Sequence, residues 1–495
     1  MHKEISLPSM LILNLLSCPR VHTYQLSASH PPSKRVGARV TSPSAIAPAA
    51  ALPHPLPSAE DLATYDAICD AEQSSGGFVD GLAARRVFLG SQLPMESLAA
   101  LWRLADMDGD GQLSRREFRV AMHLAVQASD YGVPVPARLS PELLDALGAS
   151  RFDVAVELCE RRIVHGEPIA LSRALPSLLR ECFEDDVDAT LQRSERTLLA
   201  NVTCLCPTDG VSGDQLFNDE LLRFQAAQTR EGRQCRGGAC GDACSRVALA
   251  GLASAAECDE MRRRAAALMA SHGSRPEGRS PHLDEAVARE ETSLSLDALA
   301  AGGDVRALLL FVRLLERVRR AIAREYGLPL NSIFADSGFV SRISARAAPA
   351  SYGIVHADES SSDRFHYSAL LYLNSQHEGS EGDGSFGGGE FVFSDAPVEQ
   401  TPSPWRSPQP SPVAGLTTAI DAAGRSEWRL APVKGRALLF SGGLENVHYV
   451  APVTGDGERF AIGTFWTTAP AELEEPSQDL AQVALGLLLS SAASS

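Results

Sequence analysis

The chain has 495 residues, a formal net charge of −17 and ten cysteines. At roughly 150 residues for an average domain, this length predicts about three domains, each large enough to bury a core of its own. The acidic balance argues against a nucleic-acid-binding protein, because such proteins need a basic face to neutralise phosphates.

Residues 1–57 are expected to be a disordered or targeting segment. The apolar run at 5–16 contains Pro8 and Asn14 and is shorter than the roughly twenty residues that cross a bilayer, so no transmembrane span is expected. The run resembles the core of a signal peptide, with an untargeted tail as the alternative. Residues 27–58 are rich in Ala, Pro and Ser and contain no acid, a composition that buries too little apolar surface to fold.

Residues 106–117 carry the pattern of a twelve-residue Ca²⁺ loop. Carboxylates occupy the first, third and fifth positions, a glycine permits the turn at the sixth, and a glutamate at the twelfth can bind the ion bidentately. Apolar residues at helical spacing on both sides complete a helix-loop-helix unit. An acidic turn without metal is the alternative. The predicted ligands are Asp106, Asp108, Asp110, Gln112 and Glu117.

A partner hand is expected upstream, at about residues 65–93, where a glycine turn is present but too few acids accompany it to bind a metal. In this region the chain resembles the EH domain family. The likeness is carried by Gly77-Phe78, Ser91–Pro94, Leu101–Asp106, Glu117-Phe118, Ala121–Leu124 and Pro134–Pro136. It implies an all-α pair of EF-hands at 58–150, and a pocket for Asn-Pro-Phe peptides with Trp102 at its floor. Core packing is the alternative role for Trp102.

Residues 151–245 are expected to form a helical connector, because leucines recur there at helical spacing. No catalytic pattern is present in it. Five of the ten cysteines fall between Cys204 and Cys244. This clustering indicates a disulfide framework in an oxidising compartment or a metal knuckle in a reducing one, and the lack of a CxxC pair favours disulfides.

Residues 246–475 begin with helical patterns and continue with strand patterns. A strand at 247–252 precedes a helix that opens at Ser254 with a capping box, and an amphipathic helix covers 305–326. Short strands with glycine turns then indicate a double-stranded β-helix, or jelly roll, with flanking helices. With a further short helix in the tail at 476–495, the chain is predicted to be an α+β multidomain protein. The predicted strands are 338–343, 367–373, 390–393, 436–440 and 459–467.

Two imidazoles and a carboxylate in the strand-rich region form a candidate iron site. His356 and Asp358 are one residue apart, at the expected end of a strand, and His448 lies far downstream. Such a triad occupies one face of an octahedral Fe(II) and leaves three positions open for a cosubstrate and O₂. Arg459 is expected on the next strand, pointing behind the metal, where its planar fork suits the far carboxylate of a dicarboxylate. His366 fits a packing or supporting role better than that of a fourth ligand.

Around these residues the chain resembles Fe(II)/2-oxoglutarate dioxygenases of the prolyl hydroxylase type, and most of all prolyl 3-hydroxylases (leprecans). The likeness is carried by His366–Asn374, Gly388–Phe391, Gly435–Ala437, Phe440–His448 and Arg459–Ala461. It implies that His356, Asp358 and His448 bind iron and that Arg459 binds the distal carboxylate of 2-oxoglutarate. It also implies that Tyr372 hydrogen-bonds this cosubstrate, with core packing as the alternative, and that ascorbate serves as reductant.

Three functions are compatible with these patterns. The first, favoured by the intact ligand set, is a dioxygenase that hydroxylates a protein side chain, most of all peptidyl proline, with a Ca²⁺-binding module attached. The second is an adaptor that binds Asn-Pro-Phe peptides beside a silent oxygenase fold, and the third is a hydroxylase of a small molecule, because iron chemistry does not select the substrate. The lumen of the endoplasmic reticulum is slightly favoured as the location, because prolyl 3-hydroxylases work in the secretory pathway. The cytoplasm, where EH modules work, is the alternative.

Overall fold

The structure is a computed structural model, which describes residues 55–165, 168–200, 202, 245–271, 291–344, 355–377, 385–395, 415–469 and 479–494, apart from residues 75, 363 and 423. The apolar run at 5–16 and the cysteine group from Cys204 to Cys244 lie outside these residues. No helix among the described residues combines the length and the apolar composition that a bilayer crossing requires.

The first described region is a helical module built from two helix-loop-helix units. Two of its helices begin at Ser58 and Ser114, whose hydroxyls accept backbone hydrogen bonds from Asp61 and Glu117. The carboxylates of these acids accept from the serine backbone in return, which is the capping-box pattern. A short antiparallel strand pair joins the two loops, an addition to the predicted all-α fold. The elements are α1 (Ala59–Glu72), β1 (Val79–Asp80), α2 (Gly81–Leu89), α3 (Met95–Ala105), β2 (Gln112–Leu113), α4 (Arg115–Asp130) and α5 (Pro141–Ala146).

The connector is helical at first and then joins a sheet. Helices α6 (Arg151–His165) and α7 (Pro168–Arg193) are followed by strand β3 (Glu195–Ala200). Apolar side chains of α6 and α7 belong to the same buried cluster as those of α12 (Val305–Tyr326), so the connector is packed into the C-terminal region. Strand β3 departs from the predicted all-helical connector.

A seven-stranded antiparallel sheet forms one layer of the C-terminal region. Its strand order is β3-β4-β12-β7-β15-β6-β5, so that segments far apart in the sequence lie side by side. The six strands besides β3 are β4 (Arg246–Ala250), β5 (Glu291–Ser295), β6 (Phe334–Ser344), β7 (Tyr367–Tyr372), β12 (Ala437–Ser441) and β15 (Glu458–Thr467).

A four-stranded sheet in the order β10-β11-β9-β13 forms the second layer, accompanied by the pair β14-β8. Tyr372 and Phe440 from the large sheet share one buried cluster with Phe391, Phe393 and Trp428 from the small sheet. The two sheets therefore pack face to face, in an arrangement of the predicted jelly-roll type. The strands are β8 (Phe386–Gly388), β9 (Phe391–Asp395), β10 (Leu416–Ile420), β11 (Ser426–Leu430), β13 (His448–Val450) and β14 (Val453–Gly455).

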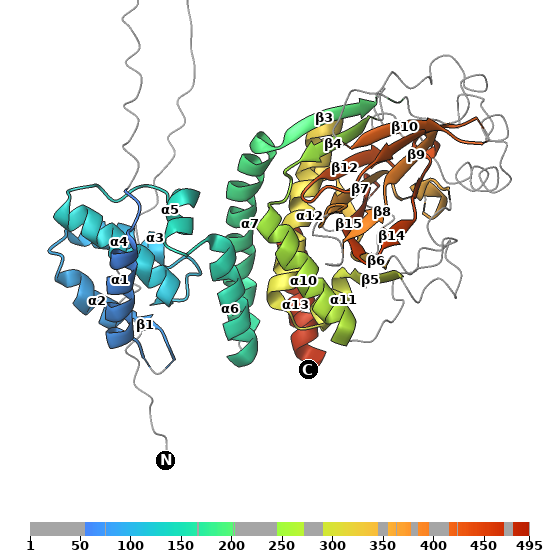
Figure 1. Cartoon of the computed structure of the whole chain (residues 1–495). Helices are drawn as coiled ribbons and strands as arrows, with labels where there is room; N and C mark the ends of the chain where they lie inside the picture. The colour runs from blue at the N-terminus through green and yellow to red at the C-terminus, as the bar shows by residue number, and fades with distance from the viewer. Residues whose placement is uncertain are drawn as a thin grey trace, which may run out of the picture. The chain divides into compact units, whose positions relative to one another are not determined.

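Helices cover the outer face of the seven-stranded sheet (Figure 1). Along β15, Phe460 and Ile462 belong to the cluster shared with α12, whereas Ala461 belongs to the cluster between the sheets. Because successive residues of a strand point to opposite faces, Arg459 points with Ala461 into the space between the sheets. The remaining helices are α10 (Ala255–Ser271), α11 (Leu296–Ala301) and α13 (Leu480–Ser494).

The longer predicted elements are confirmed and the shorter ones were missed. Helix α12 has the predicted bounds, and Ser254 caps α10 through its hydroxyl and Glu257. Besides β3, strands β5, β8, β10, β11, β13 and β14 were not predicted, because three to five residues are too few to establish a period of two. Strand β5 lies between α10 and α11 in the chain, so the prediction that helices precede strands is wrong in part.

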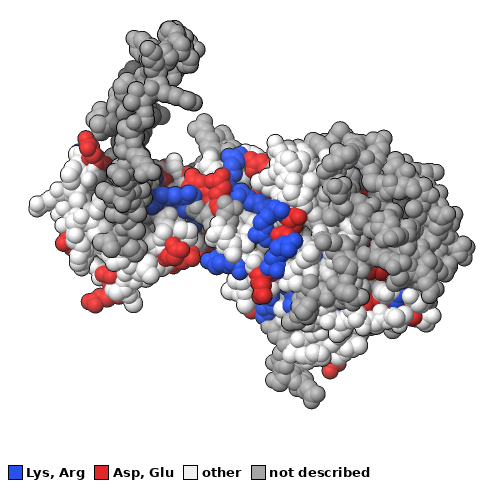
Figure 2. All heavy atoms as spheres, turned by 90° about the horizontal axis from the view of Figure 1, so that it is seen from above, with Lys and Arg blue, Asp and Glu red and all other residues white. Residues whose placement is uncertain are grey.

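Charged side chains of both signs lie next to one another over the middle of the face shown in Figure 2. Between the helices, too, arginines lie next to carboxylates and form ion pairs. Arg313 and Arg317 of α12 lie 2.6 and 2.7 Å from the carboxylate of Asp186 on α7, and Arg317 also lies 2.7 Å from Glu257 on α10. These pairs join three helices behind the large sheet.

Candidate metal centres

His356 and His448 come together through a two-residue antiparallel bridge. The His356 backbone N–H donates to the His448 carbonyl at 2.9 Å, and the reverse bond is 2.8 Å long. Directly opposite residues of antiparallel segments place their side chains on the same face. The two ring centroids are accordingly 4.5 Å apart.

Asp358 completes the group at the start of a 3-10 turn, η5 (Asp358–Ser360). Its Oδ1 lies 3.6 Å from His356 Nε2 and 3.5 Å from His448 Nε2. One ligand atom from each of the three residues lies within 4.8 Å of the others, close enough to share one ion. Asp358 is 5% exposed and His448 is 4% exposed, so the group is largely shielded from water.

Gly442 allows the loop that carries Asp358 to lie against the end of β12. A Cβ atom at Gly442 would stand 1.9 Å from the Phe365 carbonyl oxygen, which no side chain permits. The Gly442 carbonyl accepts from the Glu359 backbone N–H at 2.9 Å, which holds the residue next to Asp358 in place. Sequence reasoning included Gly442 in a family likeness but did not assign it this role.

A buried hydrogen-bond chain orients His448. Its Nδ1 lies 2.8 Å from the Asn446 carbonyl oxygen, which directs Nε2 toward Asp358. The Asn446 side chain donates to the Ser441 carbonyl at 3.0 Å and accepts from Arg246 Nε at 2.7 Å. Asn446 and Arg246 are both fully buried. These supporting residues were missed, because nothing in a single sequence links Arg246 to a histidine two hundred positions later.

The two histidines decide the charge of Asp358. Burial by itself would raise the pKa of its carboxyl, but the charge of His448 and hydrogen bonds from both imidazoles lower that pKa well below its usual range. Asp358 is therefore an ionised carboxylate at neutral pH. An anionic oxygen beside two imidazole nitrogens is a suitable donor set for Fe(II).

Arg459 and Tyr372 meet in the space between the sheets. Arg459 is 1% exposed, its Nε donates to the Gly389 carbonyl at 3.0 Å, and its Cζ lies 5.3 Å from the centre of the Tyr372 ring. Gly389 has φ +68°, and a Cβ there would stand 2.8 Å from the Arg459 side chain. Within the described residues, Arg459 Nη2 and Tyr372 Oη are buried without a hydrogen-bond partner. Two orphaned donors at one place fit the carboxylate of an anionic cosubstrate.

Two details of the predicted site were wrong. His356 does not end a described strand but forms an isolated bridge, and β14 comes between the strands of His448 and Arg459. Among the described residues, His366 lies outside the three-residue group, and its packing or supporting role stays a prediction. Its Nδ1 accepts from the Thr468 backbone N–H at 3.0 Å.

The predicted Ca²⁺ loop also gathers its acids. Asp106, Asp108 and Glu117 bring carboxylate oxygens within 4.8 Å of one another, and Gly111 turns the loop with φ +79°. Asp110 does not join this group, although its Oδ1 accepts from the Gln112 backbone at 2.7 Å.

Mutual repulsion makes this loop a good host for a cation. Burial and the charge of Asp110 raise the pKa of Asp108 to about 7. Burial and the charge of Asp108 raise the pKa of Glu117 well above its usual value. A bound cation would remove both penalties, so the donor set fits Ca²⁺.

Trp102 lies on α3 immediately before the loop. It is partly buried against the core of the helical module, and its Nε1 donates to Asp106 Oδ2 at 3.1 Å. The ring thus contacts both the core and the first residue of the predicted Ca²⁺ loop. Its role in peptide binding stays a prediction.

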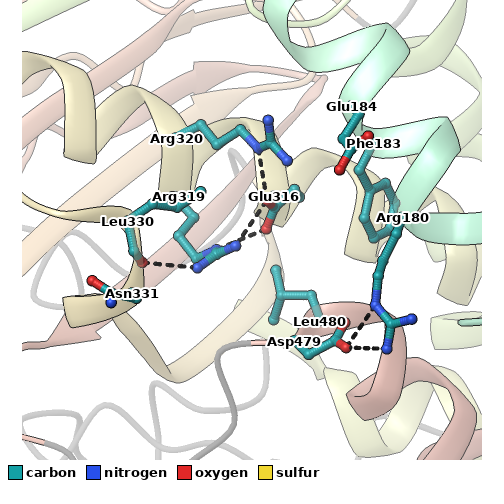
Figure 3. A pocket seen from close by; sticks show the side chains of 10 residues that line it. All are labelled: Arg180, Phe183, Glu184, Glu316, Arg319, Arg320, Leu330, Asn331, Asp479 and Leu480. Carbon is teal, nitrogen blue, oxygen red and sulfur yellow. Dashed lines mark hydrogen bonds and ion pairs between the residues drawn. The ribbon is translucent and has the colours of Figure 1, made fainter. Parts of the chain in front are cut away.

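A pocket of about 340 Å³ lies away from these residues, between α7, α12 and the start of α13 (Figure 3). Its arginines bind acids of its own wall: Arg319 and Arg320 donate to Glu316 at 2.7 and 2.8 Å, and Arg180 donates to Asp479 at 2.9 Å. None of the predicted site residues lines it.

Comparisons with known proteins agree with this division into two centres. Residues 58–147 match the family model described as EH domain, and residues 345–468 match the one described as 2OG-Fe(II) oxygenase superfamily. The acids of the predicted Ca²⁺ loop lie in the first range, and the histidines, Asp358 and Arg459 lie in the second. The chain therefore carries an EH domain, followed by a 2OG-Fe(II) oxygenase domain.

Individual relatives resemble parts of the chain. Human epidermal growth factor receptor substrate 15 is 45% identical over 85 residues, 17% of this chain and 9% of that protein. Mouse intersectin-2 is 45% identical over 73 residues, 15% of this chain and 4% of that protein, so the chain spans less than a tenth of either relative. A solved Trichoplax adhaerens prolyl hydroxylase, in complex with a hypoxia inducible factor peptide fragment, is 17% identical with a TM-score of 0.31. The match covers 52% of this chain and 96% of that chain.

Proposed function

We propose that the chain is an Fe(II)- and 2-oxoglutarate-dependent dioxygenase that hydroxylates a protein side chain, with peptidyl proline as the preferred target. The observation that carries the proposal is the convergence of His356, Asp358 and His448, with buried donors of Arg459 and Tyr372 that find no partner among the described residues. A silent scaffold would have no reason to keep buried, unsatisfied donors, because each costs about 1–3 kcal/mol.

The residues of the chain divide the work of this reaction. His356, Asp358 and His448 would hold Fe(II) on one face, and when bound the iron supplies the activation of O₂ that 2-oxoglutarate, with ascorbate as reductant, makes possible. Arg459 would pair with the distal carboxylate of 2-oxoglutarate, and Tyr372 would donate its hydroxyl to the same group. Asp358 would fill, on bound iron, the place that a halide needs, which favours hydroxylation over halogenation.

A protein substrate is favoured by the EH domain in the same chain, whose family likeness implies a peptide pocket at Trp102. We further infer that the loop of Asp106, Asp108, Asp110, Gln112 and Glu117 binds Ca²⁺, because its crowded carboxylates suit a cation. Proline is favoured by the residues that resemble prolyl 3-hydroxylases, His366–Asn374 and Phe440–His448 above all.

Succinate release tests the oxygenase proposal. The full chain, supplied with Fe(II), 2-oxoglutarate, ascorbate and a panel of proline peptides, is expected to release succinate in step with peptide oxidation. Succinate release without oxidation of any peptide would favour the small-molecule alternative. No release of succinate from iron-loaded protein, with or without peptide, would leave the adaptor function, which calorimetry with an Asn-Pro-Phe peptide then tests directly.

The cysteines test the compartment. We propose a location in the secretory pathway, supported by the grouping of cysteines between Cys204 and Cys244. Mass mapping of those thiols in protein isolated from its own cells is expected to find disulfides. Free thiols would instead favour the cytoplasm.

A further inference from the structure

An arginine of the connector lies in the acidic loop of the EH domain. Arg161, on α6, has its Nη2 3.2 Å from Asp108 Oδ2 and forms a second ion pair with Asp110. Its guanidinium carbon stands 4.1 Å from the centre of the Phe78 ring, in the loop of the other hand. The side chain is 11% exposed, so the contact is largely withdrawn from water.

This contact places a positive charge among the carboxylates of the loop. The loop brings several carboxylates close together, and the Arg161 guanidinium is an opposite charge in contact with two of them, Asp108 and Asp110. Arg161 therefore supplies one positive charge where a Ca²⁺ ion would supply two. Asp110, which is the third ligand of the predicted loop, is paired with Arg161 and stays out of the group formed by Asp106, Asp108 and Glu117.

The rest of α6 is tied to the oxygenase region. Phe152 and Leu158 are buried in the large cluster that contains α12, and Asp153 pairs with Arg306 of α12 at 2.7 Å. Glu157 pairs at 3.1 Å with Arg116, which belongs to both the loop and the start of α4. Helix α6 thus contacts both the loop and the oxygenase region.

We propose that α6 is an internal partner of the calcium loop, and that Arg161 and Ca²⁺ compete for Asp108 and Asp110. The inference rests on the calcium site of the proposed function. Ca²⁺ needs carboxylate oxygens at about 2.3–2.6 Å. A guanidinium that is hydrogen-bonded to the same oxygens stands where the ion would have to lie. The two cations also repel each other. Ca²⁺ binding therefore draws Asp110 into the ligand group and releases the end of α6.

Calcium titration of the full chain by calorimetry tests the competition. The Arg161→Gln variant is expected to bind Ca²⁺ with a Kd about tenfold lower than the wild-type chain, because the competing cation is gone. Arg151→Gln is the matched control: it lies on the same helix and pairs with Glu181, away from the loop, and its Kd is expected to equal that of the wild type. An unchanged or higher Kd in Arg161→Gln overturns the proposal.

A second measurement follows the helix itself. Hydrogen exchange of residues 151–165 in the wild-type chain is expected to rise when Ca²⁺ replaces a chelator, and to be insensitive to Ca²⁺ in Arg161→Gln. Unchanged exchange in the wild type at saturating Ca²⁺ overturns the release of α6. If neither chain binds Ca²⁺, the inference and the calcium site fail together. The oxygenase proposal is judged separately, by succinate release.

Discussion

The two centres of this chain are built in opposite ways. The predicted Ca²⁺ loop takes all its side chains from twelve consecutive residues, whereas the predicted iron triad needs a bridge between His356 and His448 and a glycine at 442. Their carboxylates differ as well: two imidazoles lower the pKa of Asp358, and burial among other acids raises that of Asp108. A site made of unlike donors is preorganised by its own charges. In a site made of like charges, the repulsion is relieved only when a cation binds.

The largest effect is expected from His356→Ala, which should affect the oxygenase centre and leave the EH domain unchanged. Loss of one of three ligands is expected to reduce succinate release at least about a hundredfold and to remove bound iron, while Ca²⁺ binding stays unchanged. Iron content, succinate and Ca²⁺ titration are measured on the same preparation. His366→Gln serves as comparison, and retention of iron by His356→Ala would show that the triad is not the metal site.

Gly442→Ala tests how far the iron triad depends on the backbone. A methyl group 1.9 Å from the Phe365 carbonyl must displace the loop of Asp358, with an expected cost of about 3 kcal/mol in unfolding free energy and weaker iron binding. Denaturant unfolding and iron titration measure both effects. Gly486→Ala in α13, where a Cβ meets nothing within 4 Å, is expected to stabilise the chain by up to about 1 kcal/mol. Equal behaviour of the two variants would contradict the role of Gly442.

Arg459→Ala probes the cosubstrate end of the oxygenase centre. Removing a buried charged donor is expected to raise the KM for 2-oxoglutarate about tenfold to a hundredfold, with a smaller change in kcat at saturation. Arg459→Lys keeps the charge but loses the planar fork, so its KM for 2-oxoglutarate is expected to lie between those of the wild type and Arg459→Ala. Steady-state kinetics with varied 2-oxoglutarate decide the point, and an unchanged KM in Arg459→Ala would move the cosubstrate elsewhere.

A structural carboxylate sharpens the comparison of buried acids. Burial opposes the ionisation of Asp186, but Arg313 and Arg317 lower its pKa to about 2. Because the folded pKa lies below the unfolded value, the stabilisation is complete above about pH 4 and is lost as the pH falls toward 2, by about 2 kcal/mol. Asp186→Asn is expected to flatten this part of the acid unfolding curve, and an unaltered pH profile would contradict the assignment.

The parts of the chain that follow a local period were predictable, and the contacts between distant segments were not. Helix α12 has its predicted bounds because one apolar stripe, Asp304 as N-cap and Gly327 at its end all agree. The twelve-residue loop pattern could also be recognised in the sequence, because all its positions are consecutive. The triad was found because imidazoles and a carboxylate at that spacing are rare in a strand-rich context.

Long-range packing explains what the sequence did not show. No local pattern relates the segments that are joined by the hydrogen bond from Arg246 to Asn446 or by the ion pair of Arg161 with Asp108. The short strands were missed because cross-strand pairing, and not their own periodicity, makes them strands. Gly442 is intelligible only once the Phe365 carbonyl lies against it.

Strand β3 carries a practical consequence for dissecting this protein. It pairs along β4, from Glu195 opposite Ala250 to Ala200 opposite Arg246, at the end of the seven-stranded sheet. A fragment that begins at residue 246 would strip that cover and expose the unpaired backbone of β4, an edge onto which another molecule can add a strand. Such a fragment is expected to aggregate, and expression of the catalytic half should start before α6.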